Sequence, residues 1–259
     1  MENKAVSNKK IGILATGSEL ISGEITNTNS PFIAQELIKN ELTPGEHLTC
    51  DDFPDNLTNS MEFLLKQSQA IIITGGLGPT EDDRTRFIIS KLINSKLEFD
   101  QNSFEHIKQR LQAKNIELKA NNKQQCYFPK NSIIIPNQKG TAAGFITPAQ
   151  YNSINKIIIA LPGPPNENQP MLINTAIPFL IKNNFIYPQY KLRWCTENIP
   201  ESNLDNALTP IKNKYNIEIA YRIHKPKCDI KINLPKQEFT FALMEEVKNA
   251  VNIILNNIT

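Results

Sequence analysis

Residues 71–86, IIITGGLGPTEDDRTR, join an apolar run to a glycine-rich turn and a pair of acids. Residues 71–74 are apolar or β-branched without alternation, which predicts a strand buried on both faces, as in a parallel sheet. Three glycines, a proline and a threonine follow, and then Asp82 and Asp83. A strand, a glycine turn and a helix N-terminus leave unpaired backbone N–H groups beside a partial positive charge. This combination suits a phosphate or diphosphate.

The glycine pattern does not fit two common nucleotide-binding loops. The fingerprint GxGxxG fails because Glu81 takes the place of its last glycine, and a Walker A loop fails because no Gly-Lys-Ser/Thr follows. A purely structural alternative remains open, in which Thr80 caps the next helix with Asp83 at the capping-box position. That alternative leaves unexplained why three glycines, a proline and two acids fall within residues 75–83.

The two acids pose an electrostatic problem for a bound diphosphate. Two like charges 4 Å apart repel each other by about 4 kcal/mol at an effective dielectric constant of 20. A divalent cation reverses the sign, because the carboxylates hold the ion and the ion holds the phosphate oxygens. We therefore predict that Asp82 and Asp83 bind a metal ion or orient a metal-bound water.

The composition indicates an ordinary globular protein without a strong charge bias. The 259 residues can form one large domain or two modest ones, and the net charge of +2 favours neither nucleic acid nor an anionic membrane. Neither an apolar signal region nor a membrane-spanning run is seen, so we expect a cytoplasmic location and no membrane partner. The four cysteines form no CxxC pair and are expected to be reduced. The three histidines are far apart in sequence, so a zinc site built on them is not expected.

The first 184 residues alternate short apolar runs with helical patterns, which predicts an α/β domain with a mostly parallel sheet covered on both faces. Strands are expected at 10–15, 70–74, 132–136, 143–147 and 156–161, and helices at 30–40, 55–68, 80–93, 104–113 and 161–184. Ser30 is the expected N-cap of the first helix, with Pro31 at its first position.

The remaining residues, 185–259, predict a small α+β domain. Strands are expected at 190–197, 217–224 and 228–234, with helices at 200–215 and 239–257. The strands alternate apolar and polar residues, which indicates a sheet with one face open to solvent or a partner.

Three further stretches end in turns near the same edge of the predicted sheet. ATGSELISGEITNTN (15–29) supplies Thr16, Glu19 and Asn29, which should lie near Gly75–Asp83 because loops at the carboxyl ends of neighbouring strands converge. Glu19 is a third carboxylate, or else a surface acid in a first helical turn. PNQKGTAAG (136–144) reads most simply as a plain loop. LPGPPNE (161–167) is another glycine turn before a helix, with an acid in the first turn.

The stretches TGSELISGEITNTN, TGGLGPTEDDRT, NQKGTAAGF and LPGPPNE, in that order and spacing, resemble the N-terminal region of the competence/damage-inducible CinA family, and the layout matches over residues 10–259. The resemblance implies a three-layer α/β/α domain of the molybdopterin-binding MogA/MoaB type over residues 1–184, then a KH-type domain over 185–259. It also implies a homodimer and a metal-dependent pyrophosphatase acting on ADP-ribose or a related dinucleotide such as FAD or NAD. Mg²⁺, Mn²⁺ or Co²⁺ is the expected ion, with K⁺ as a further candidate.

The predicted site combines the residue patterns with this resemblance. The catalytic residues are Asp82, Asp83 and Glu19, and the metal ligands are Asp82, Asp83 and Glu167. The substrate-binding residues are Thr16, Asn29, Thr74, Gly75, Gly76, Gly78, Thr80, Gly140, Thr141 and Gly163.

The chain departs from the family pattern at Ser18, Ala143 and Asn168, where the family usually has Asp, Pro and Met. If the missing Asp is a metal ligand, activity is in doubt. Longer family members continue into a nicotinamide mononucleotide amidohydrolase domain. The present sequence stops at Thr259, so that activity is not expected.

Other functions also fit the pattern. One is molybdopterin binding or adenylyl transfer in molybdenum cofactor synthesis, and another is a catalytically silent homologue with a binding role. RNA binding through residues 187–259 is not expected, because KH domains clamp the backbone with a GxxG loop and this segment contains no glycine. An open sheet face is better suited to dimer formation.

Overall fold

The computed structural model describes residues 9–258, and the chain divides into two compact units. The first unit ends at Ile186 and the second begins at Tyr187. The boundary expected from the sequence, between residues 184 and 185, lies two residues earlier. Each unit has its own hydrophobic core and is described by itself.

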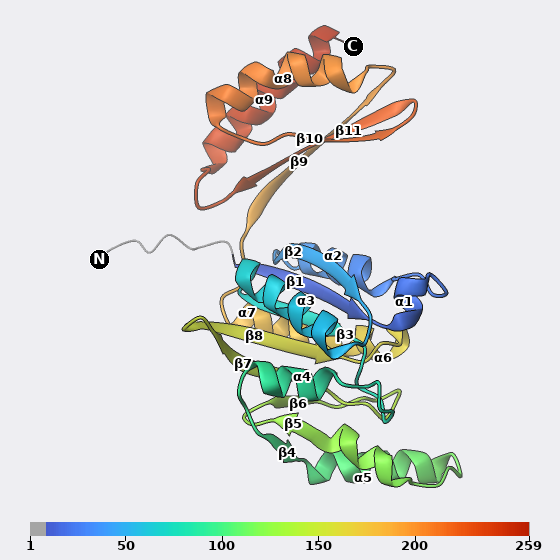
Figure 1. Ribbon diagram of the computed structural model, residues 1–259. Coiled ribbons are helices and arrows are strands. Elements are labelled where there is room, and N and C mark those ends of the chain that lie inside the picture. The colour runs from blue at the N-terminus through green and yellow to red at the C-terminus, as the bar shows by residue number, and fades with distance from the viewer. Residues whose placement is uncertain (1–8, 259) are drawn as a thin grey trace. The chain divides into compact units, whose positions relative to one another are not determined.

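The first unit is built on a six-stranded sheet with the order β2-β1-β3-β8-β7-β6 (Figure 1). Its strands are β1 (Lys10–Thr16), β2 (Thr43–Cys50), β3 (Ala70–Thr74), β6 (Ile133–Ile135), β7 (Gly144–Tyr151) and β8 (Ile154–Leu161). The first four strands of that order are parallel, β7 is antiparallel to β8, and β6 is antiparallel to β7. The prediction of a mostly parallel sheet is therefore confirmed. Strand β2 was missed because TPGEHLTC contains Pro and Gly and no apolar run, which only an edge strand tolerates well.

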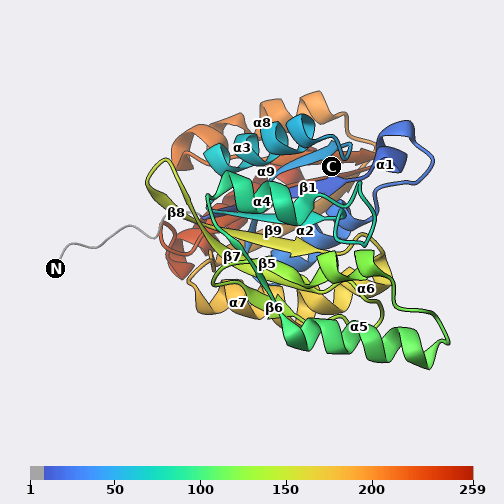
Figure 2. The same cartoon turned by 60° about the horizontal axis from the view of Figure 1, so that its bottom comes forward.

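Helices cover both faces of this sheet, which gives the predicted three layers. On one face lie α3 (Pro54–Gln67) and α4 (Thr85–Leu92), side by side in Figure 2, whose Leu64 and Ile89 pack with Leu14 of the sheet. On the other face lie α2 (Asn29–Lys39) and the continuous run α6 (Pro165–Met171), η2 (Leu172–Ala176) and α7 (Ile177–Lys182). The sheet side chains that face them, such as Ile13 and Ile72, are fully buried.

Two predicted helix starts are wrong. Helix α2 begins at Asn29, so Ser30 is not its N-cap; instead the Ser30 amide donates to Asn27 Oδ1 over 3.1 Å. Helix α4 begins at Thr85, because residues 80–84 form turns that close the glycine loop. Thr80 is therefore not the N-cap of this helix.

Between α4 and β6 the chain forms a small satellite that the sequence only partly predicted. It contains β4 (Leu97–Phe99), α5 (Gln101–Ala113), η1 (Ala120–Cys126) and β5 (Tyr127–Pro129), with β4 and β5 paired antiparallel. The Phe99 ring contacts those of Phe104 and Tyr127. Asp100 caps α5 by accepting from the Ser103 amide over 2.6 Å.

The second unit follows the order β9 (Gln189–Glu197), α8 (Glu201–Tyr215), β10 (Ala220–His224), β11 (Lys227–Pro235) and α9 (Phe241–Ile258). Its three strands form an antiparallel sheet with β11 in the centre. Alternation along β11 buries Ile230, Ile232 and Leu234 against residues of α8 and α9, while the intervening residues point to the other face. Assignment of this unit to the KH type stays a prediction. Across residues 9–258, no helix is long and apolar enough to cross a membrane.

Candidate functional site

A pocket of about 340 Å³ lies at the carboxyl ends of β1, β3 and β8. Because these strands are parallel and adjacent, the loops that follow them meet there, as the sequence predicted. Ten of the predicted site residues line it: Thr16, Glu19, Gly75, Gly76, Gly78, Asp82, Asp83, Thr141, Gly163 and Glu167.

The glycine loop after β3 needs glycine for two physical reasons. Gly75 and Gly76 have φ values of +109° and +66°, which side chains disfavour. A Cβ on Gly75 would lie 2.3 Å from the backbone oxygen of Thr16 in the neighbouring loop. The loop is then fixed by bonds from Gly75 N to Leu161 O and from Thr85 Oγ1 to Gly75 O, each 3.0 Å long.

The Asp83 carboxylate holds this loop closed by accepting hydrogen bonds from Gly78 and Thr80. Its Oδ1 accepts from the Gly78 amide over 2.7 Å, and its Oδ2 accepts from the amide and the hydroxyl of Thr80 over 2.9 and 2.5 Å. The prediction that the amides from Gly75 to Thr80 are free for an anion is therefore only partly right. From Gly75 to Thr80, the Gly76 and Leu77 amides are the two N–H groups for which the described residues provide no hydrogen-bond partner.

Every charged residue that lines the pocket in the described part of the chain is acidic: Glu19, Asp52, Asp82, Asp83 and Glu167. The Thr80 hydroxyl and the local backbone hold the pKa of Asp82 below its ordinary value, so this exposed side chain is ionised at neutral pH. An anionic ligand in such a pocket requires a cation. Carboxylate oxygens are the donors that Mg²⁺ and Mn²⁺ prefer, so the residues present fit the predicted ion.

The predicted ligands are spread around the pocket and are not preassembled. Over residues 9–258, these carboxylates include no group of three with ligand atoms all within 4.8 Å of one another. An ion held here would thus depend on water or substrate oxygens for part of its coordination, which is typical of Mg²⁺.

Glu167 is positioned by the loop that begins at Asn137. The buried Asn137 amide group donates to Glu167 Oε2 over 2.6 Å, and its oxygen accepts from the Gly140 amide over 2.6 Å. A Cβ on Gly140 would lie 2.2 Å from that same carboxylate oxygen. Gly140 does not line the pocket, so its role is to leave room for Glu167. The turn of 136–144 is therefore more than a plain loop.

Three other predicted substrate residues do not line the pocket. Thr74 is buried at the end of β3, and Thr80 faces Asp83. Asn29 donates to Gly163 O over 2.8 Å and accepts from Asn168 Nδ2 over 3.0 Å. Asn29 thus fixes the Gly163 turn from behind the pocket wall.

Asp52 is a lining residue that the sequence analysis missed. Its two oxygens accept from Thr16 Oγ1 over 2.8 Å and from the Ser18 amide over 3.0 Å. Asp52 follows β2, so failure to recognise that strand also hid the acid at its end. Strand β2 is the fourth parallel strand that ends at this edge, so recognising it would also have placed Asp52 at the pocket.

Arg86 is a second missed residue and lies beneath the glycine loop. Its side chain is fully buried and donates through Nη2 to the carbonyl oxygens of Leu77 and Gly78. Its Nε and Nη1 atoms are buried without a partner among the described residues. Burial lowers the pKa of Arg86 to about 10, with nearby Asp83 opposing the shift. Arg86 therefore remains charged at neutral pH. An arginine in a first helical turn is usually exposed, so no sequence pattern indicated that Arg86 would be buried.

Residues 12–182 match the family described as "Probable molybdopterin binding domain". The chain belongs to this family. Among curated proteins, it is 34% identical over 249 residues to a provisionally named competence-damage inducible protein of Clostridium botulinum strain Loch Maree. It is 40% identical over 212 residues to the corresponding protein of strain ATCC 19397. These alignments cover 95% and 82% of the chain but 60% and 51% of the relatives' length.

A crystal structure of CinA from Thermoplasma acidophilum, described as having unknown function, matches the fold with a TM-score of 0.58 and 27% identity. That match covers 69% of the present chain and 99% of the other. The predicted α/β/α fold of a molybdopterin-binding domain and the expected CinA-like resemblance are thereby confirmed.

Within this molybdopterin-binding domain, the departures at Ser18 and Asn168 have visible consequences. The Ser18 backbone and hydroxyl contact Asp52, so a carboxylate still lies beside the position where an acid was expected. Asn168 is buried and donates to the oxygens of Asn29, Gly163 and Pro164, which a methionine could not do. Ala143 is buried in the core of the domain, and nothing in its surroundings explains its difference from proline.

Proposed function

We propose that the first unit is a metal-dependent nucleotide pyrophosphatase whose substrate is ADP-ribose or a related adenine dinucleotide such as FAD or NAD. The observation that carries the proposal is the pairing of two free loop amides, Gly76 and Leu77, with five surrounding carboxylates. Amides without carboxylates would suit a simple phosphate-binding protein. Carboxylates without amides would suit a cation site alone.

In this proposal the two amides bind diphosphate oxygens and orient the anhydride. Asp82, Glu19 and Glu167 would hold a Mg²⁺, Mn²⁺ or Co²⁺ ion, because their carboxylates lie around the pocket and Asp83 is engaged within the loop. Such an ion supplies charge neutralisation and an activated water when bound. Hydrolysis of ADP-ribose with one water gives AMP and ribose 5-phosphate.

The buried Arg86 is a positioning residue in this scheme. Its guanidinium bonds the carbonyls of Leu77 and Gly78, which holds the loop that carries the free amides. Asp52 has a similar role on the opposite wall, because it fixes Thr16 and the Ser18 backbone.

The direct test is incubation of the purified protein with ADP-ribose and Mn²⁺, followed by chromatographic detection of AMP. We expect AMP release that EDTA abolishes and added Mn²⁺ restores. AMP release that is unchanged after exhaustive EDTA treatment, or no release with any of the three ions, would overturn the proposal.

A second candidate function is favoured by the family match itself: binding of a molybdopterin, or adenylyl transfer to it. The same pocket would then hold the pterin phosphate. Equilibrium binding separates the two, since retention of a pterin with no binding of ADP-ribose favours this candidate. Binding of ADP-ribose without hydrolysis would instead identify a silent homologue with a binding role.

The assembly is also a proposal. The CinA-like resemblance implies a homodimer, and light scattering coupled to size exclusion would measure its mass directly.

A further inference from the structure

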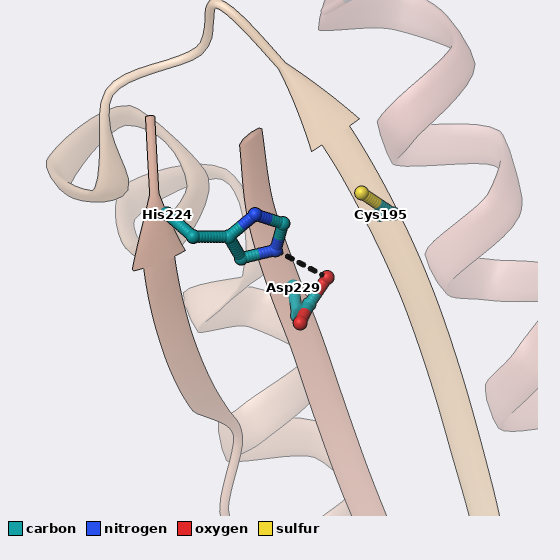
Figure 3. A group of neighbouring side chains, drawn as sticks. All are labelled: Cys195, His224 and Asp229. Carbon is teal, nitrogen blue, oxygen red and sulfur yellow. Dashed lines mark ion pairs between the residues drawn. The ribbon is translucent and has the colours of Figure 1, made fainter. Parts of the chain in front are cut away.

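Three metal-binding side chains meet on the sheet of the second unit. Cys195 comes from β9, His224 from β10 and Asp229 from β11, and Figure 3 shows them at neighbouring positions of the three strands. Their ligand atoms all lie within 4.8 Å of one another. Among residues 9–258, no other group of three or more His, Cys, Asp and Glu side chains brings its ligand atoms this close together.

Strand register explains why these side chains share one face. Cys195 is directly opposite Asp229, and His224 is opposite Lys227, two residues from Asp229 on the same strand. Side chains two residues apart on a strand point to the same face. The opposite face carries Cys228 and Ile230, which pack against residues of α8 and α9. The three polar side chains therefore lie on the face that these helices leave uncovered.

The distances are close to those of a metal centre. His224 Nε2 and Asp229 Oδ1 are 3.0 Å apart. Two ligands each about 2.0 Å from a zinc ion at a tetrahedral angle lie about 3.3 Å apart. A Zn²⁺ ion can thus bind between the His224 imidazole and the Asp229 carboxylate after a small displacement of these side chains. The Cys195 sulfur, on the adjacent strand β9, lies within 4.8 Å of both ligand atoms.

The donor set selects the metal. A thiolate, an imidazole and a carboxylate together suit Zn²⁺ and not Mg²⁺ or Ca²⁺, which prefer oxygen. Thiolate and carboxylate carry two negative charges, which balance those of the ion. We propose that Cys195, His224 and Asp229 form a Zn²⁺ site with one position left for water or an outside ligand.

Partial exposure gives the ion a route in. Cys195 is exposed, and the His224 and Asp229 side chains are 43% and 29% exposed. Zn²⁺ binding deprotonates the Cys195 thiol, because the thiolate is the form that binds the metal. Glu197 favours the cation on this face, whereas Arg222 and Lys227 oppose it.

The test uses Co²⁺ as a probe, because thiolate coordination to Co²⁺ gives an intense near-ultraviolet charge-transfer band. The full chain, reduced with a phosphine and stripped of metal, is titrated with Co²⁺ and then with Zn²⁺. We expect the band to saturate at one equivalent and to disappear when Zn²⁺ displaces the cobalt. The carboxylate pocket of the first unit has no cysteine among its lining residues in the described chain, so metal bound there gives no such band.

Variants assign the band to the proposed ligands. Cys195→Ser should abolish it, and His224→Gln and Asp229→Asn should each weaken Zn²⁺ binding at least 10-fold. Glu197→Gln, which removes a neighbouring acid two residues along β9, is the matched control and should keep the band. Far-ultraviolet circular dichroism of each variant checks that the fold is retained.

Either of two results would refute the proposed zinc site. Absence of the band in the reduced wild-type chain, or its persistence in folded Cys195→Ser, overturns the zinc site. Loss of AMP release in the first unit does not affect the result, because the two readouts depend on different residues.

Discussion

The two units carry contrasting candidate sites. The pocket of the first unit is built where the loops after several parallel strands meet, and the charged groups among its described lining residues are all carboxylates. The cluster of the second unit is built from one side chain on each of three strands and contains sulfur, nitrogen and oxygen donors. The first therefore suits a hard ion together with an anion, and the second suits a softer ion alone. In the first unit, the loops after parallel strands bring the polar groups of a site together. In the second unit, the register between paired strands brings together side chains that are far apart in sequence.

The largest expected effect is loss of catalysis when a free carboxylate of the pocket is removed. Asp82→Asn should lower kcat/KM for ADP-ribose by roughly 10²–10³-fold, the scale seen when one preorganised charge-stabilising group is removed. Its side chain is exposed, and the loop is closed by the hydrogen bonds of Asp83, so the fold should be unchanged. Steady-state assays of AMP release measure the effect.

The control for this variant is Glu81→Gln, which removes a charge one residue earlier outside the pocket lining. Equal losses in both variants would mean that general surface charge, and not a metal ligand, is involved. Zn²⁺ binding by the second unit should be unchanged in both variants.

The second prediction concerns the backbone that makes the pocket. Gly75→Ala should lower the free energy of unfolding by about 3 kcal/mol or more, because a positive φ and a 2.3 Å approach to the Thr16 carbonyl cannot both be relieved. Gly163→Ala is the matched control, since the nearest atom to its Cβ would be 3.7 Å away. We expect a change below about 1 kcal/mol there.

Urea denaturation followed by circular dichroism measures both variants. If Gly75→Ala unfolds like wild type, the loop is more adaptable than a preorganised anion site allows. The contrast with the second unit would then lose its physical basis.

The third prediction tests whether Arg86 supports the ligand-binding loop or only stabilises the fold. Arg86→Met removes its bonds to the Leu77 and Gly78 carbonyls but also removes a desolvated cation, so the net change in stability should be within about 2 kcal/mol. The affinity for ADP-ribose with Mn²⁺ should fall about 10-fold, because the loop amides lose their support. Calorimetric titration with matched denaturation data gives both quantities.

The pH dependence of this variant has a definite sign. Burial lowers the folded-state pKa of Arg86 to about 10, below its value in the unfolded chain. Above pH 10 the folded state therefore binds fewer protons than the unfolded state, and the cost of burying the charge is full below pH 10. Relative to wild type, Arg86→Met should be most stable at neutral pH and lose that advantage as the pH rises through 10. A large loss of stability at neutral pH with unchanged affinity would make Arg86 a residue of the fold alone.

The smallest effect expected is in proton release at the second unit. An ordinary thiol is mostly protonated at pH 7 to 8, so Zn²⁺ uptake should release about one proton from Cys195. The affinity for Zn²⁺ should consequently fall about 10-fold between pH 8 and pH 7. Calorimetry in buffers of different ionisation enthalpy counts the protons. A release of none would mean that the sulfur is not a ligand.

Much of the first unit could be predicted from its sequence. The apolar runs indicated β1, β3 and β8 because strands buried on both faces consist mainly of apolar residues. The glycine turns after them placed ten site residues in one pocket, since parallel strands end at a common edge. Edge strand β2 and its acid Asp52 were missed because an edge strand needs no apolar run.

Other features depended on contacts that no local pattern contains. The sequence could not show that Asp83 would occupy the Gly78 and Thr80 amides, that Arg86 would be buried below them, or that Asn29 would support Gly163. Nor could it show that His224 would meet Cys195 and Asp229, because a pairing register shifted by one residue would put side chains on opposite faces. The order of apolar and glycine residues determined which elements form and where their loops converge. The tertiary structure alone decided which polar atoms are left free there, because each hydrogen bond depends on how distant segments pack.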